Sequence, residues 1–200
     1  MKNKNALIII AKYPELNNVM TRLAGSMPDK KRLVLYISLL ESTVQRLRSI
    51  PGVDTFIAYA PQNSKEYFSK FNVKLLPLSK GDLGERMLDA MSRVLAEGYE
   101  KTALAGVDIP ELTGSIILKA FELLSGNDIV YGPAGDGGYY LVGIKKPVKE
   151  IFNDIQWSTE RTLEQCMDKA KQFGYSVVFT KTLSDVDTPE DLENTDLPTY

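Results

Sequence analysis

Short runs of β-branched and aliphatic residues alternate along almost the whole chain with longer segments of helical periodicity. The first run, residues 7–10, is continuously apolar, as expected of a strand buried on both faces of a sheet. This alternation predicts an α/β fold in three layers, with a mostly parallel sheet between helices. Further strands are expected at 55–59, 73–76, 102–105, 129–131, 139–144 and 176–180, and helices at 29–48, 64–71, 82–98, 115–124, 159–173 and from Thr188.

One connection breaks the parallel pattern. The glycine-rich stretch around residues 135–138 is too short for a parallel crossover, so its two strands are expected to form a hairpin or a local antiparallel element. No composition shift or linker divides the chain. We therefore expect a single domain over residues 1–194, followed by a loose polar tail at 195–200.

Composition excludes several kinds of chemistry. The 200 residues carry a formal net charge of −2, which argues against a protein that binds nucleic acid through bulk charge. Histidine is absent, so a histidine base, a Ser-His-Asp triad and a histidine-ligated metal are excluded. Cys166 is the one cysteine, which excludes an intrachain disulfide and is typical of helix packing. The apolar run at 6–11 is far shorter than the ~20 residues that span a membrane, and we expect a cytoplasmic protein.

Charged residues gather where predicted strands end. Ligands of open α/β sheets bind beyond the carboxyl ends of the strands. Lys12 and Arg22 follow the first strand, where cations and backbone N–H groups could hold a phosphate or could equally be solvated loop residues. Asp108 and Asp187 follow two later strands, and parallel topology brings both to the same edge. Together they suit Mg²⁺ or Mn²⁺ carrying a diphosphate, although Asp108 could also only shape its turn.

Asp136 lies among the glycines of the predicted hairpin. Glycine permits close backbone approach to a ligand, and a tight turn alone explains the glycines but not this carboxylate. A functional role is therefore favoured for Asp136 over a role in shaping the turn. Trp157 precedes a predicted helix, and a core anchor is favoured there over stacking on a base or sugar.

Several ordered motifs together resemble the small stand-alone glycosyltransferase-like proteins of the GT-A, nucleotide-diphospho-sugar transferase fold, a family associated in part with arsenosugar biosynthesis. The similarity runs from about residue 6 to residue 192. The matching stretches are residues 11–12 with 21–23, 81–87, 108–110, 132–133 with 136–140, 157–159 and 185–192.

The resemblance implies a role for each motif. Lys12, Thr21 and Arg22 would lie in the nucleotide loop, and a stretch containing Gly84 and Arg86 would pass near the nucleotide. Asp108 would take the place of the metal-binding aspartate, and Asp187 would be a second metal ligand, with Mg²⁺ or Mn²⁺ as cofactor. Asp136 would face the sugar or acceptor. Since the chain has no histidine, Asp136 is also the best candidate for a catalytic base if the reaction inverts the anomeric centre.

The expected activity is that of a metal-dependent glycosyltransferase, which moves a sugar from a nucleoside diphosphate to a small acceptor. The superfamily also contains nucleotidyltransferases, which join a nucleoside triphosphate to a phosphorylated metabolite. The chain departs from the family pattern at Leu16-Asn17, where Pro-Gly is usual, at Met20, where Lys is usual, and at Val107 and Gly135, where Ser and Glu are usual. A non-catalytic nucleotide-binding module is therefore a third possibility.

Overall fold

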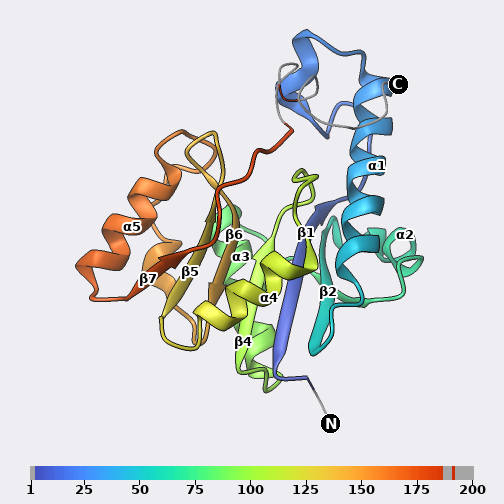
Figure 1. Ribbon diagram of the computed structural model, residues 1–200. Helices are drawn as coiled ribbons and strands as arrows, with labels where there is room; N and C mark the ends of the chain where they lie inside the picture. The colour runs from blue at the N-terminus through green and yellow to red at the C-terminus, as the bar shows by residue number, and fades with distance from the viewer. Residues whose placement is uncertain (1–2, 187–190, 192–200) are drawn as a thin grey trace.

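The computed structural model describes residues 3–186 and residue 191. These residues form a seven-stranded sheet in the order β3-β2-β1-β4-β6-β5-β7, which confirms the α/β prediction (Figure 1). The strands are β1 (Asn5–Lys12), β2 (Val53–Ala60), β3 (Lys74–Pro77), β4 (Lys101–Ala105), β5 (Ile129–Pro133), β6 (Tyr139–Ile144) and β7 (Val177–Phe179). The helices are α1 (Asp29–Leu47), α2 (Lys65–Ser69), α3 (Leu83–Ala96), α4 (Gly114–Leu123) and α5 (Thr162–Gln172), with short 3₁₀ turns η1 (Thr21–Gly25), η2 (Gln62–Ser64) and η3 (Lys149–Ile151).

Strand β6 runs antiparallel to both of its neighbours, β4 and β5, whereas the other paired strands are parallel. The hairpin expected at the glycine-rich turn is therefore confirmed. Its turn lies where β5 ends, on the same edge of the sheet as the carboxyl ends of the parallel strands. The loops that follow β1, β4, β5 and β7 consequently meet at one edge.

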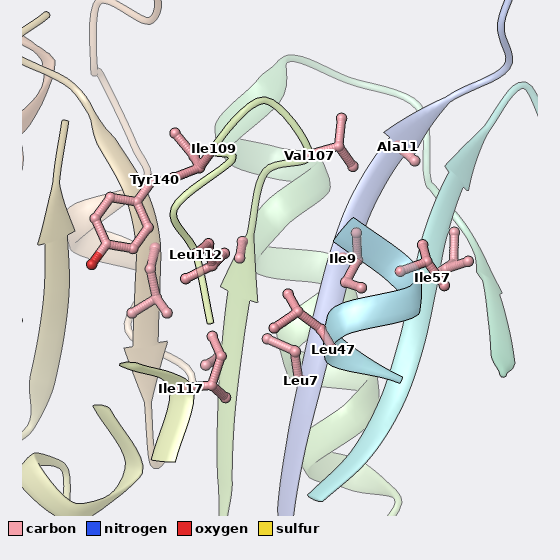
Figure 2. Close-up of a cluster of buried hydrophobic side chains, with 14 of the residues drawn as sticks. Leu7, Ile9, Ala11, Leu47, Ile57, Val107, Ile109, Leu112, Ile117 and Tyr140 are labelled. Atoms are coloured by element: carbon pink, nitrogen blue, oxygen red, sulfur yellow. The ribbon is translucent and has the colours of Figure 1, made fainter. Parts of the chain in front are cut away.

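Two apolar layers enclose the sheet. Alternate residues of β1 point to opposite faces, so Leu7 and Ile9 pack in one core and Ala6 and Ile8 in the other. Helices α1, α2 and α4 cover the first face, and Figure 2 shows part of that core. Helices α3 and α5 cover the second face with η3. Both faces of the sheet are thus withdrawn from water, which leaves its edges and loops as the places for a site.

The start of the predicted helix at 82–98 depends on two local hydrogen bonds. Asp82 accepts from the backbone N–H of Glu85 at 2.8 Å, and the Glu85 carboxylate accepts from the backbone N–H of Asp82 at 2.9 Å. This reciprocal capping box satisfies two N–H groups that the helix itself leaves unpaired. It fixes the start of α3 at the edge of the sheet where the loops meet.

The structure begins α5 at Thr162, three residues later than the sequence pattern suggests. Ser158 has a left-handed backbone, with φ of 62°, which breaks helical geometry before the expected start. The hydroxyl of Thr162 accepts from the N–H of Thr159 at 3.2 Å and closes a turn instead. The helix expected from Thr188 and the tail at 195–200 lie outside the described residues. Within the described part of the chain, no helix combines the length and apolar character needed to cross a membrane.

Candidate functional site

Two adjoining pockets open at the edge where the loops meet. We name them the β1 pocket, of about 330 Å³, and the β6 pocket, of about 220 Å³. Six of the described residues line both pockets, so the two pockets form one continuous cleft. The shared residues are Ile10, Arg22, Leu83, Gly106, Asp108 and Ser158.

The β1 pocket gathers the cationic residues predicted from the first loop and from the start of α3. Lys12 ends β1, Thr21 and Arg22 lie in η1, and Arg86 lies in the first turns of α3. The Arg86 Nε is buried and has no hydrogen-bond partner among the described residues. A buried guanidinium N–H without a partner is costly.

Helix α1 fixes the first loop through two buried polar side chains. The Tyr36 hydroxyl accepts from the Lys12 backbone N–H at 2.8 Å and donates to the Lys12 carbonyl oxygen at 3.0 Å. Burial raises the pKa of Tyr36 above its usual range, so the hydroxyl keeps the proton that it donates. One turn earlier, Arg32 is 3% exposed and donates to the carbonyl oxygens of Val19 and Met20 at 3.2 and 3.3 Å.

The same helix also holds the loop after β4. The Thr43 hydroxyl donates to the Val107 carbonyl oxygen at 3.1 Å. Arg46 donates to the carbonyl oxygens of Leu112 and Ile109 at 3.1 and 3.3 Å. The loop that carries Asp108 is therefore fixed on both sides of that residue.

The loop of Asp108 contacts the segment that follows β7. The Asp108 carbonyl oxygen accepts from the Val186 N–H at 2.9 Å, and Asp185 lines the β6 pocket together with Asp108. Asp187, the second metal ligand expected from the sequence, lies outside the described residues. The structure thus shows a second carboxylate near Asp108, supplied by Asp185.

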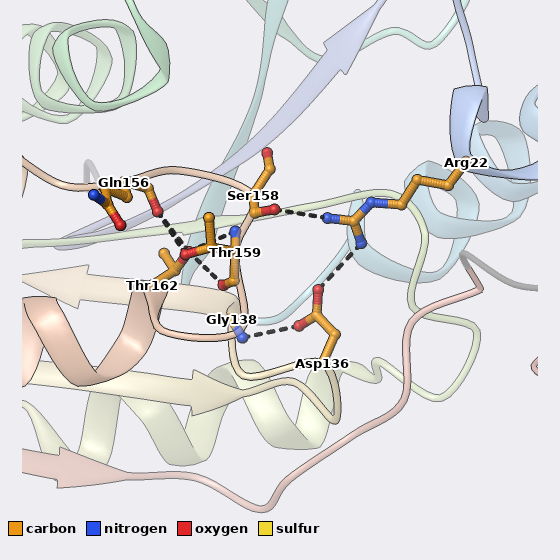
Figure 3. A network of polar contacts seen from close by, with 7 residues as sticks. All are labelled: Arg22, Asp136, Gly138, Gln156, Ser158, Thr159 and Thr162. Atoms are coloured by element: carbon orange, nitrogen blue, oxygen red, sulfur yellow. Dashed lines mark hydrogen bonds and ion pairs between the residues drawn. The ribbon is translucent and has the colours of Figure 1, made fainter.

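Asp136 lies in the β5–β6 turn and is held from two sides (Figure 3). One carboxylate oxygen accepts from the Gly138 N–H at 2.8 Å, and the other pairs with Arg22 at 3.3 Å. Arg22 also donates to the Ser158 carbonyl oxygen at 3.3 Å. Gly137 has φ of 85°, and a Cβ there would collide with the Glu160 carbonyl oxygen, which explains why this turn requires glycine. Arg22 therefore bridges the cleft from η1 to the hairpin and the Ser158 turn.

Aromatic side chains form the apolar wall of the β6 pocket. The rings of Tyr139 and Trp157 meet edge to face with centroids 6.4 Å apart, and both residues line the pocket. Trp157 packs directly on Gly84, where a Cβ would lie 2.6 Å from an indole carbon. The indole is partly exposed at the pocket, so Trp157 combines packing with a place at the site.

The structure brings together six of the eight predicted site residues. The six are Lys12, Thr21, Arg22, Arg86, Asp108 and Asp136. Gly84 instead lies beneath Trp157 and is not among the described residues lining either pocket. Asp185 was not among the predicted site residues, although it lies in the stretch 185–192 that matches the family. The supporting residues Arg32, Tyr36 and Arg46 were missed because a polar side chain on a helix resembles a surface or core position until its partners are known.

The donor set of the cleft fits a hard divalent cation. Asp108 and Asp185 supply oxygen ligands on one pocket, which is the ligand type that Mg²⁺ and Mn²⁺ prefer. Among the described residues, no group of three or more acidic, histidine or cysteine side chains could hold a metal by itself. Mg²⁺ commonly takes one or two carboxylates and completes its shell with water and substrate phosphate oxygens.

Solved structures of other proteins share this fold. A candidate nucleotide-diphospho-sugar transferase from Desulfovibrio desulfuricans G20 is 30% identical, with a TM-score of 0.86 over 93% of this chain and 83% of its own. The 4-diphosphocytidyl-2C-methyl-D-erythritol synthase of Anaerococcus prevotii is 11% identical, with a TM-score of 0.63 over 96% and 94% of the two chains. Glucosyl-3-phosphoglycerate synthase of Mycobacterium tuberculosis, solved with Mn²⁺, UDP and glucosyl-3-phosphoglycerate, is 10% identical, with a TM-score of 0.56 over 96% and 75%.

The first of these likenesses extends to sequence, whereas the other two are likenesses of fold. No curated protein matches the chain significantly in sequence. The resemblance to stand-alone proteins of the nucleotide-diphospho-sugar transferase fold is confirmed by the D. desulfuricans structure. Residues 43–159, more than half of the chain, match the model of DUF2064, described as an uncharacterized protein conserved in bacteria, and the chain therefore belongs to this family.

Proposed function

We propose that the protein is a metal-dependent glycosyltransferase that moves a sugar from a nucleoside-diphosphate donor to a small acceptor. The observation that carries this proposal is the two-part cleft, in which Asp108 lies where a cationic pocket joins an aromatic and acidic one. The D. desulfuricans structure, named as a candidate transferase of nucleotide-diphospho-sugars, supports the same class.

In this proposal the β1 pocket binds the nucleoside diphosphate. Lys12, Arg22 and Arg86 contact the phosphates, because charge-assisted N–H donors are the strongest partners of phosphate oxygens. Thr21 adds a hydroxyl from η1. Gly84 contributes indirectly, since its contact with Trp157 sets the distance between α3 and the second pocket.

Asp108 holds the metal with Asp185, and Asp187 stays a predicted further ligand. The metal, when bound, neutralises charge on the leaving nucleoside diphosphate. Asp108 lies on the wall that the two pockets share, and Asp185 lines the β6 pocket. The proposal has the donor's diphosphate end, and its sugar begin, at this shared wall.

The β6 pocket binds the transferred sugar and the acceptor. The Trp157 ring offers an apolar face to sugar C–H groups. Asp136 takes the proton of the acceptor hydroxyl if the reaction inverts the anomeric centre. Its carboxylate can act as a base once Arg22 turns to the phosphates, and its second contact, with the Gly138 N–H, keeps it oriented.

Binding measurements test this proposal. Calorimetry with UDP, GDP, CDP and ADP, with and without Mn²⁺, should find one nucleotide whose binding is strengthened by the metal. Asp108→Ala should abolish the metal-dependent part, whereas Asp168→Ala, an exposed carboxylate of α5, should not. Nucleotide binding by Asp108→Ala with unchanged metal dependence would show that the site is assigned wrongly.

A nucleotidyltransferase is the second candidate, because the A. prevotii synthase shares the fold at a TM-score of 0.63. The two reactions release different products. Release of pyrophosphate from a nucleoside triphosphate would identify the nucleotidyltransferase, and release of a nucleoside diphosphate from a nucleotide sugar would identify the glycosyltransferase.

A further inference from the structure

The cleft separates its charges along its length. Among the described residues, the β1 pocket is lined by the cations Lys12, Arg22 and Arg86 and by one carboxylate, that of Asp108. The β6 pocket reverses this balance. Its lining holds the carboxylates of Asp108, Asp136 and Asp185 and one cation, Arg22.

Arg22 does not supply the β6 pocket with surplus positive charge. Its guanidinium pairs with Asp136 at 3.3 Å and donates to the Ser158 carbonyl oxygen at 3.3 Å. When Arg22 turns to a nucleotide phosphate, the Asp136 charge is left uncompensated. Arg161, close in sequence to this wall, pairs with Glu164 at 2.9 Å and lines neither pocket.

A divalent metal would offset the charges of Asp108 and Asp185, and the cations of the β1 pocket would offset the diphosphate. The carboxylate of Asp136 then stays uncompensated in the β6 pocket. A phosphate or carboxylate on a second substrate would lie beside this carboxylate in a partly enclosed pocket, where like charges repel more strongly than in water.

We infer that the second substrate is a hydroxyl compound that is uncharged or positively charged, and not a phosphorylated or carboxylated metabolite. The inference rests on the proposed function and narrows its acceptor. The aromatic wall of Tyr139 and Trp157 suits such a compound, because it offers apolar contact without requiring charge. The acidic lining also disfavours the nucleotidyltransferase alternative, whose substrate carries a phosphate.

The potential of the pocket can be measured without knowing the substrate. Thr159 is exposed and lines the β6 pocket, and Thr21 is exposed and lines the β1 pocket. Each is replaced by cysteine in a separate variant, Thr159→Cys and Thr21→Cys. The native Cys166 is fully buried, and burial raises its thiol pKa to about 12, so it does not react with the reagents. The rates of modification by a cationic and an anionic methanethiosulfonate reagent are then compared, and their ratio cancels any effect of the thiol pKa.

We expect the cationic reagent to modify Thr159→Cys at least tenfold faster than the anionic one, and Thr21→Cys to show the opposite preference. Adding Asp185→Asn to Thr159→Cys should lower the ratio severalfold, whereas Asp168→Asn should leave it unchanged. Equal rates at Thr159→Cys, or a faster anionic reagent, would overturn the inference whether or not the protein binds nucleotide. Failure of the protein to bind any nucleotide would instead refute the proposed function and leave the reagent ratio interpretable.

Substrate pairs extend the test to turnover. With a donor established by calorimetry, glycerol and glucosamine are compared with glycerol 3-phosphate and glucose 6-phosphate, and consumption of the donor is followed. Phosphorylated compounds should not be used better than their uncharged or cationic partners. Efficient transfer to either phosphate ester would contradict the inference even if the reagent ratios agreed with it.

Discussion

At the scale of single residues, the pair of Arg22 and Asp136 links the two halves of the cleft. Arg22 has the β1 pocket on one side and Asp136 and the Ser158 carbonyl on the other. A guanidinium has five N–H donors, but those bonded to the hairpin are not available to phosphate. In the proposed function, the donor phosphates and the Asp136 carboxylate therefore compete for the same guanidinium group.

Asp136→Asn should tighten nucleoside-diphosphate binding while it removes transfer activity. Loss of the carboxylate charge weakens the hold on Arg22, and a partly exposed ion pair of this kind is worth ~0.5–1 kcal/mol, or about twofold to fivefold in affinity. Loss of a general base lowers the rate by roughly 10²–10⁴-fold. Calorimetry and donor turnover on one preparation measure both effects. Full turnover would eliminate Asp136 as the base, and unchanged affinity would mean that Arg22 is not shared.

Met20→Lys should also strengthen nucleotide binding. Met20 lines the β1 pocket at the position where the family pattern has lysine. An added charge-assisted contact is worth ~1.5–3 kcal/mol before the cost of ordering the side chain. Leu16→Lys is the matched control, since it adds the same charge in the same loop at a residue 46% exposed that is not among the described lining of either pocket. An equal gain in nucleotide affinity in both variants would show that the added charge acts by long-range attraction and not by contact with phosphate.

At the scale of elements, α1 supports both loops that carry the proposed metal and phosphate ligands. Its polar contacts come from residues 32, 36, 43 and 46, spaced so that they face the sheet edge along one side of the helix. The rest of that side is apolar and buried in the core. The helix therefore orders the two loops relative to one another as well as covering the sheet.

Tyr36→Phe should loosen the phosphate loop with little change in core packing. The variant keeps the ring but leaves the Lys12 N–H and carbonyl without their partner, at a cost of ~1–3 kcal/mol in the free energy of unfolding. Nucleotide affinity should fall as well, because Lys12 loses its fixed position. Urea unfolding and calorimetry measure the two, with Tyr13→Phe, 38% exposed in the same loop, as control. A fall in stability with unchanged affinity would show that Lys12 does not bind phosphate.

Gly84→Ala tests how α3 meets the Trp157 wall. The added Cβ would collide with the Phe152 carbonyl oxygen and with the indole ring, and overpacking of this kind costs ~1–3 kcal/mol. Gly126→Ala is the control, since a Cβ at Gly126 has no atom within 4 Å among those of the described residues. Thermal unfolding should show a lower Tm for Gly84→Ala only. A normal Tm with weakened nucleotide binding would instead favour direct contact between residue 84 and the nucleotide.

At the scale of the whole molecule, a second polar cluster joins strands at the edge opposite the cleft. The Tyr99 hydroxyl donates to Asp54 at 2.5 Å, and Lys74 and Asn3 donate to the same carboxylate at 2.9 and 2.7 Å. These hydrogen bonds, that of Tyr99 first, lower the pKa of Asp54 to about 2. The cluster ties β2 to β3 and to the approaches of β1 and β4, far from the proposed chemistry.

Acid should therefore weaken the fold through Asp54. A carboxylate whose pKa is lower in the folded protein than in the unfolded chain stabilises the folded state. The contribution is complete when the pH is above the unfolded pKa of ~3.9, and it is lost as the pH falls toward 2. The Tm of the wild type should exceed that of Asp54→Asn near pH 6, and the difference should shrink between pH 4 and pH 2. A constant difference across that range would mean that the charge of Asp54 is not what the cluster uses.

The elements of the fold could be predicted from sequence because both faces of the sheet are buried. Strands buried on both faces are continuous apolar runs, and helices that cover a sheet have apolar residues at helical spacing. The loops at the strand ends could be located by the same rule, and Lys12, Arg22 and Asp108 do meet there. The pairing of Arg22 with Asp136 could not be predicted, since it depends on how η1 faces a hairpin more than a hundred residues away. The contact of Gly84 with Trp157 is equally a product of tertiary packing.

The reversed direction of β6 has a consequence for how such a protein can change. A turn between two strands is a surface connection, and such connections tolerate insertions and deletions better than the strands and helices that they join. The β6 pocket, proposed to bind the acceptor, includes such a turn, whereas the β1 pocket, proposed to bind the nucleotide, depends on α1 and on the parallel strands. Under the proposed function, the β6 pocket can thus be remodelled over generations for a new recipient molecule while the β1 pocket continues to accept the same activated donor.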